Sequence, residues 1–80
     1  MIIFDRNGKH VLSPVTLFLN PTEATELADA ASSLASEPTI HHCHVFDTAY
    51  ETEITVAVHT YKNIHLFDSE SRSLLKRRCC

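Results

Sequence analysis

The side chains best suited to chemistry in this chain lie together in His41-His42-Cys43-His44. An alternating run of apolar and polar residues follows at 53–59, ending in His59. If both segments are strands, residues two apart point to one face, so His42 and His44 share a face and His59 can join them from the neighbouring strand. Three imidazoles with an open fourth position can hold a catalytic zinc ion. One hypothesis is therefore a zinc-binding protein or zinc hydrolase using His42, His44 and His59.

The same strand face supports a second hypothesis, a contact surface for another protein. It would mix aromatic rings and imidazoles, which suit contact with a partner better than solvation alone. We expect the partner to be another protein or a second copy of this chain. The residues expected to contact it are Phe18, Ile40, His42, His44, Phe46 and His59.

Two further properties of this segment bear on its chemistry. Neighbours in a strand point to opposite faces, so His42 and His44 cannot readily take a proton from Cys43, which we expect to be a small buried hydrophobe.

Histidines that share a face gain charge together below about pH 6.5 and could loosen an interface there, unless they titrate independently. We expect a protein without enzymatic activity.

Composition limits the class of protein. Eighty residues with 44% apolar and 21% charged side chains fit one small domain with a thin core. The net charge of -3, with a basic run only at 76–78, argues against a nucleic-acid partner. The first residues lack a basic stretch followed by a long apolar one, so we expect no secretory signal and a cytoplasmic location. We expect one domain over 1–78 and a flexible tail at 79–80.

The last five residues carry the one resemblance in the chain. Lys76-Arg77-Arg78-Cys79-Cys80 resembles the doubly prenylated C-terminus of Rab-type small GTPases, and the resemblance covers nothing else. It implies membrane attachment only if Cys79 and Cys80 are lipidated. The chain has no glycine-rich phosphate-binding loop, so a GTPase domain is not expected.

The residue pattern of the first 19 residues predicts strands. Residues 2–6 and 9–12 flank Asn7-Gly8, which favours a two-residue type I′ turn and a hairpin with Phe4 opposite Val11. Pro14 lacks an N–H and interrupts the pairing, after which Val15 to Leu19 predicts a third strand.

The remaining elements follow from capping and alternation. Asn20-Pro21-Thr22-Glu23 predicts a capping box and a helix that ends near Ser36. Residues 40–46 and 53–60 predict paired strands, and Asp68 predicts the cap of a short C-terminal helix.

Together these elements predict an α+β domain of order β-β-β-α-β-β-α. We expect a mainly antiparallel sheet of four or five strands, with the long helix on one face and the other face uncovered. The function that we expect is a non-enzymatic protein-binding module. It would be a small cytoplasmic inhibitor of the immunity or antitoxin type, or of the phage anti-defence type, acting as a monomer or a homodimer. The alternative is the zinc-binding protein or zinc hydrolase that would use His42, His44 and His59.

Overall fold

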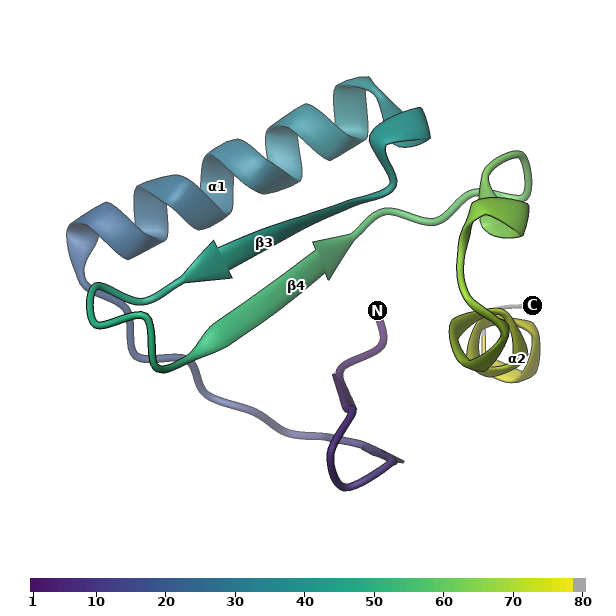
Figure 1. Cartoon of the computed structure of the whole chain (residues 1–80), viewed down its shortest axis with the longest axis horizontal. Coiled ribbons are helices and arrows are strands. Elements are labelled where there is room, and N and C mark those ends of the chain that lie inside the picture. Colours follow the sequence, from purple (N-terminus) through teal and green to yellow (C-terminus); the bar gives the residue numbers. More distant parts are fainter. Residues whose placement is uncertain (79–80) are drawn as a thin grey trace.

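The computed structural model describes residues 1–78, and side chains as far as residue 77. The chain forms two short strands, a long helix, two longer strands and a final helix, an α+β mixture (Figure 1). Two 3-10 turns, at 38–40 and 64–66, flank the longer strands. The elements are β1 (Phe4–Asp5), β2 (His10–Val11), α1 (Pro21–Ser36), β3 (His42–Phe46), β4 (Glu53–Ala57) and α2 (Ser69–Arg78).

Helix α1 begins and ends where the sequence predicts. The side chain of Asn20 accepts a hydrogen bond from the N–H of Glu23 at 2.8 Å, and the Glu23 carboxylate accepts from the N–H of Asn20 at 2.9 Å. This is the predicted capping box, which satisfies two otherwise unpaired amides. At the other end the N–H of Glu37 donates to the carbonyl of Ser33 as α1 closes. Leu34, in the last turn, is fully buried.

Strands β3 and β4 form an antiparallel hairpin whose alternation matches the prediction. Cys43 lies opposite Val56, and Val45 lies opposite Ile54. These residues form the more buried face, and α1 contacts both strands (Figure 1). The other face carries His42, His44 and Phe46, which are exposed.

The predicted sheet of four or five strands is not found in residues 1–78, where β1–β2 and β3–β4 are separate two-stranded sheets. The segment predicted as a third strand, Val15 to Leu19, is unpaired and exposed throughout. It joins the first hairpin to the start of α1 and runs past the β3–β4 hairpin as an extended link (Figure 1). Its apolar residues are strand-like in type, but the path between the two elements keeps them away from a strand edge.

The β1–β2 hairpin keeps the predicted register but not the predicted turn. Phe4 lies opposite Val11, as expected. Asp5 lies opposite His10, so four residues form the loop, and the left-handed residue is Lys9 rather than Gly8. A Cβ at Gly8 would lie 2.5 Å from the ring of His10, an exposed side chain that would have to move to make room.

Helix α2 is connected to the first hairpin by charged side chains. Lys9 Nζ lies 2.8 Å from a carboxylate oxygen of Glu70, and Arg6 lies 3.1 Å from the other oxygen and 3.4 Å from Asp68. Asp68 also accepts a hydrogen bond from the N–H of Ser71, as the predicted helix cap requires. Hydrogen bonds from Ser71 hold the pKa of Asp68 below its ordinary value, and Arg6 contributes in the same direction.

One buried side-chain amide joins two segments of the chain. Asn63 is 3% exposed, and its Nδ2 donates to the carbonyls of Pro38 at 2.7 Å and Val58 at 2.9 Å. Its Oδ1 accepts from the N–H of Thr60 at 2.7 Å. The side chain therefore ties the turn before β3 to the chain that leaves β4.

The molecule is thin. Its extents are 33 × 30 × 19 Å, and the buried hydrophobic side chains among the described residues are Leu34, Val45 and Leu74. Across residues 1–78, neither helix has the length and apolar character needed to cross a membrane.

Candidate functional site

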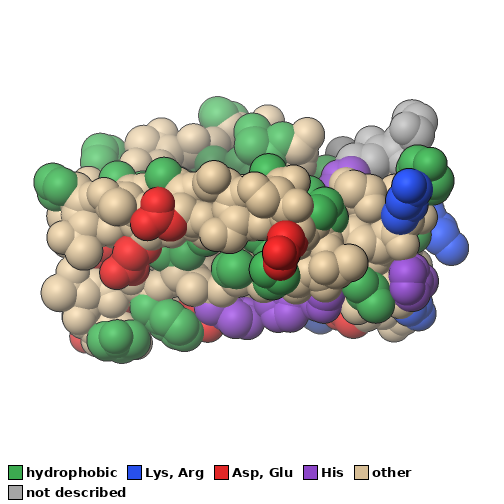
Figure 2. All heavy atoms as spheres, turned by 90° about the horizontal axis from the view of Figure 1, so that it is seen from above, with side chains coloured by type: hydrophobic (Ala, Val, Ile, Leu, Met, Phe, Trp, Pro, Cys, Tyr) green, Lys and Arg blue, Asp and Glu red, His purple; other side chains and the backbone are tan. Residues whose placement is uncertain are grey.

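Six rings lie in successive contact along β3 and beyond both of its ends. Neighbouring ring centroids are 4.4 to 6.5 Å apart, which is the range of ordinary aromatic contacts. Figure 2 shows several histidine side chains side by side in a band at the lower edge of the view, next to hydrophobic ones. We call this set the aromatic row, and in spatial order it consists of Phe67, His41, His42, His44, Phe46 and Tyr50.

His41 enters the row through an unusual backbone conformation. Its φ of 56° lies in the left-handed region, which side chains other than glycine rarely adopt. Adjacent strand residues normally point to opposite faces, but here the rings of His41 and His42 meet, with their Nδ1 atoms 2.8 Å apart. The carbonyl of His41 accepts from Val58, and its ring packs edge-on against Phe67 at 5.3 Å. His41 is half-buried, whereas His42 is exposed.

His44 is oriented by the neighbouring strand. Its Nδ1 lies 3.1 Å from the hydroxyl of Thr55, which is directly opposite in the hairpin. The same nitrogen is 3.5 Å from a carboxylate oxygen of Glu53, and both side chains are about half exposed. His44 therefore has polar partners on β4 in addition to its ring neighbours His42 and Phe46.

The surroundings of His42 favour its neutral form. Loss of solvent lowers the pKa of His42, and the nearby charges of His41, His44 and Arg6 lower that pKa further. The ring of His42 is thus held without charge at neutral pH, so it can meet an apolar or aromatic surface without the cost of burying a cation.

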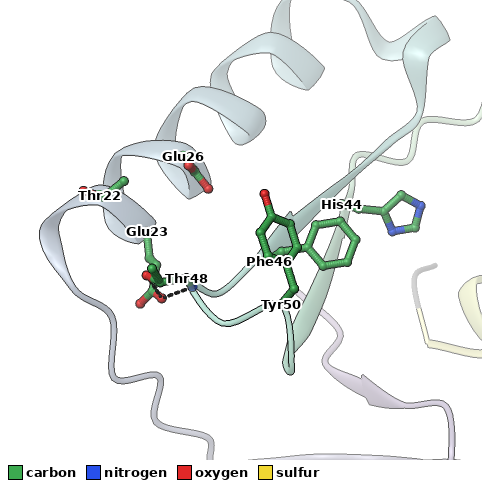
Figure 3. Close-up of a pocket in the computed structure, with 7 residues that line it drawn as sticks. All are labelled: Thr22, Glu23, Glu26, His44, Phe46, Thr48 and Tyr50. Atoms are coloured by element: carbon green, nitrogen blue, oxygen red, sulfur yellow. Dashed lines mark hydrogen bonds between the residues drawn. The ribbon is translucent and has the colours of Figure 1, made fainter.

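A pocket of about 310 Å³ opens beside the end of the row (Figure 3). The first turns of α1 form one wall, and β3 with its following loop forms the other. The carboxylate of Glu23 accepts a hydrogen bond from the N–H of Thr48 at 3.1 Å and so joins the two walls. The pocket combines carboxylates, hydroxyls and rings, and its lining residues are Thr22, Glu23, Glu26, His44, Phe46, Thr48 and Tyr50.

Three of the residues predicted to contact a partner lie together, namely His42, His44 and Phe46. Phe18 does not join their sheet face, because it lies in the unpaired link, where it is 94% exposed. Ile40 is also off that face. It belongs to the 3-10 turn and lines a different hollow, beside the last turns of α1. The left-handed His41 between Ile40 and β3 breaks the alternation that would have carried Ile40 to the histidine face.

The predicted zinc ligands are not assembled into a metal site. Strand β4 ends at Ala57, two residues before His59. Within residues 1–78, no three His, Cys, Asp or Glu side chains are placed to hold a metal ion together. Zinc binding by His42, His44 and His59 stays a prediction without a preformed ligand set.

Sequence reasoning missed three members of the row. Alternation would point His41 inward, Tyr50 falls between the two predicted strands, and Phe67 is distant in sequence, so spacing gives no signal for any of them. The predicted tail at Cys79 and Cys80 lies outside the described residues. No family model, no curated protein and no solved structure matches this chain.

Proposed function

We propose that this chain is a non-enzymatic protein-binding module whose contact surface is the aromatic row with its adjoining pocket. The supporting observation is that the row stays open to solvent. Phe46 is 39% exposed and Tyr50 is 78% exposed, although each packs against a neighbouring ring. Exposed aromatic side chains held in fixed positions are the usual centres of binding energy in protein interfaces.

The exposed area of the whole chain supports the same proposal. A folded monomer of 9.0 kDa exposes about 4,850 Å² on average, whereas this chain exposes 6125 Å². The excess, about 1,300 Å², is larger than the roughly 800 Å² that each partner contributes to a standard interface. Part of the excess belongs to the link, where Val15, Leu17 and Phe18 are exposed. A partner that covers the row would remove part of this excess area from solvent.

Charge suggests the kind of partner. The chain carries a net charge of -3, and Glu23 and Glu26 line the pocket beside the row. Acidic side chains beside one end of an aromatic surface favour fast and selective association with a basic protein surface. A small acidic inhibitor, of the immunity or antitoxin type or of the phage anti-defence type, would have this character. A homodimer that uses the same surface is the other version of the proposal.

The test compares substitutions inside and outside the row. Tagged wild-type chain is used to capture proteins from cells of its source, beside the double variant Phe46→Ser, Tyr50→Ser. The control is Tyr61→Ser, because Tyr61 is 86% exposed but lies outside the row. We expect wild type and control to retain the same partner, or the same dimer by light scattering, and the double variant to lose it while circular dichroism stays unchanged. A monomeric wild type that retains nothing, or equal retention by all three chains, would contradict the proposal.

A further inference from the structure

The closest approach between two ring nitrogens in the row is that of His41 and His42, whose Nδ1 atoms are 2.8 Å apart. In the metal-free chain one ring donates its N–H to the other. One Nδ1 therefore offers a lone pair and the other a proton, and loss of that proton would leave a lone pair on each ring beside the same small space, as a shared cation requires. His42 is exposed and His41 half-buried, so an ion can reach this space from solvent.

The separation of the two nitrogens discriminates between metals. Metal–nitrogen bonds to imidazole are about 2.0 Å long, so two nitrogens 2.8 Å apart subtend about 90° at the metal. Tetrahedral zinc needs a wider angle and a separation of about 3.3 Å. An angle near 90° belongs to the square-planar or tetragonal geometry that Cu²⁺ and Ni²⁺ prefer, and Cu²⁺ binds more tightly than Ni²⁺ to a given set of nitrogens.

The backbone holds this pair in place. The left-handed conformation of His41 brings two adjacent side chains to one side, and it is fixed at both ends. Its N–H donates to the carbonyl of Pro38, and its carbonyl accepts from Val58. Contact with Phe67 then orients the ring. A strained backbone conformation persists only where the surrounding structure holds it in place. Such conformations are concentrated at functional sites.

We propose that the Nδ1 atoms of His41 and His42 form a two-imidazole binding site for Cu²⁺, with water in the remaining equatorial positions. The ion replaces the shared proton of the N–H···N hydrogen bond, and the donor ring takes up a proton at its Nε2 from solvent. One proton leaves the donor ring at Nδ1 and one is taken up at Nε2, so both rings stay neutral. The site differs from the predicted zinc site, since it uses His41 and needs neither His44 nor His59.

The experiment is a titration of the untagged full chain with Cu²⁺, followed by visible absorption and electron paramagnetic resonance. Wild type is compared with His41→Phe and His42→Phe, which keep a ring in the row but remove both nitrogens, and with the control His10→Phe in the first hairpin. We expect one tightly bound Cu²⁺ per chain, with nitrogen hyperfine structure from two imidazoles. Each row substitution should weaken binding at least tenfold, and the control should change it less than twofold.

The variants His44→Ala and His59→Ala distinguish this site from the zinc hypothesis. Both should bind Cu²⁺ within twofold of wild type, whereas the strand-pair site would lose its ion. If His41→Phe fails to fold, the exposed His42→Phe carries the comparison alone. Equal affinity for Cu²⁺ in wild type and His42→Phe would overturn the proposal. The titration uses no protein partner, so its result is independent of the proposed protein-binding function.

Discussion

At the scale of the residue, Asn63 illustrates how a polar side chain can hold a thin protein together. Its amide is almost fully removed from solvent, and both of its polar atoms have hydrogen-bond partners. A buried amide that keeps every hydrogen bond costs little, but the carbonyls that it serves would be unpaired without it. Of the buried residues in the described part of the chain, Asn63 is polar and the other three are hydrophobic.

Replacing this amide should be costly. We expect Asn63→Ala to lower the free energy of unfolding by about 2 to 3 kcal/mol, because the carbonyls of Pro38 and Val58 lose their donor in a site closed to water. Urea denaturation followed by circular dichroism measures the loss. The matched control is Asn7→Ala in the exposed hairpin loop, which should change stability by less than about 0.5 kcal/mol. Similar losses in both variants would show that the buried hydrogen bonds are not the cause.

The lowered pKa of His42 gives stability a pH dependence. Between the folded and unfolded pKa values, the unfolded chain binds more protons at this residue than the folded chain does. Its contribution is therefore fully present above the unfolded value of about 6.5 and is lost as the pH falls through the lower folded value.

We expect the urea midpoint of wild type to fall between pH 7.5 and pH 5.0, and the fall to be smaller in His42→Gln. Glutamine removes the titration but keeps a polar side chain of similar reach. His65→Gln serves as control, because His65 lies outside the row, and its midpoint should follow wild type. An equal fall in wild type and His42→Gln would assign the pH dependence to other groups.

Side-chain alternation predicts half of the row and fails at the start of β3, where the backbone of His41 departs from the strand conformation. It places His42, His44 and Phe46 on one face, because a regular strand has a period of two. It fails for Ile40 and His41, because the left-handed backbone at His41 reverses the pattern. Histidine adopts a positive φ more often than most residues but still seldom, so nothing in the sequence singles out His41 for this conformation.

At the scale of the element, Glu23 performs two roles at the start of α1. One carboxylate oxygen completes the capping box with Asn20, and the other accepts from the N–H of Thr48 in the loop after β3. The cap of the helix and the position of the hairpin are therefore set by one side chain. The pocket beside the row depends on the same contact, because its two walls meet there.

Removal of this side chain should loosen both elements. We expect Glu23→Ala to lower the free energy of unfolding by about 1 to 2 kcal/mol, since one cap and one connection between α1 and the hairpin are lost. The control is Glu26→Ala, one turn further along the same helix and in the same pocket, which should cost less than about 0.5 kcal/mol. Thermal and urea unfolding measure both. A loss in Glu26→Ala as large as in Glu23→Ala would contradict this explanation.

The sequence predicts individual elements better than their assembly. The capping box, the end of α1, the pairing of β3 with β4 and the cap of α2 all follow from local chemistry. The single larger sheet does not form, since pairing of distant strands depends on where the chain must travel. Val15 to Leu19 has strand-like residues but spans the distance from the hairpin to α1, and no local signal encodes that.

At the scale of the whole molecule, the chain is more open than its length requires. Its radius of gyration is 13.1 Å, against about 11.6 Å for a compact domain of 80 residues. With few buried hydrophobic side chains, we expect the isolated chain to lie near or below the lower end of ordinary stability, about 4 kcal/mol for this length. Association through the row would supply the missing burial.

If two copies associate through the row, stability depends on concentration. We expect the midpoint of thermal unfolding to rise by several degrees between about 5 and 500 µM chain, because mass action favours the associated folded state. The double variant Phe46→Ser, Tyr50→Ser should show no rise, and Tyr61→Ser should behave as wild type. A midpoint independent of concentration in wild type would exclude the homodimer version and leave a different protein as the partner.

The shortest dimension of the molecule, 19 Å, has a consequence for how its sequence can vary. A helix on a two-stranded hairpin leaves room for one layer of side chains between them, so most positions face water on at least one side. Tolerance to substitution should therefore be sharply divided. A saturation mutagenesis library selected for folding would be depleted at Leu34, Val45, Leu74 and Asn63 and would accept exchange almost everywhere else. A position that accepts exchange in this selection but resists it in a selection for partner binding then marks a functional constraint.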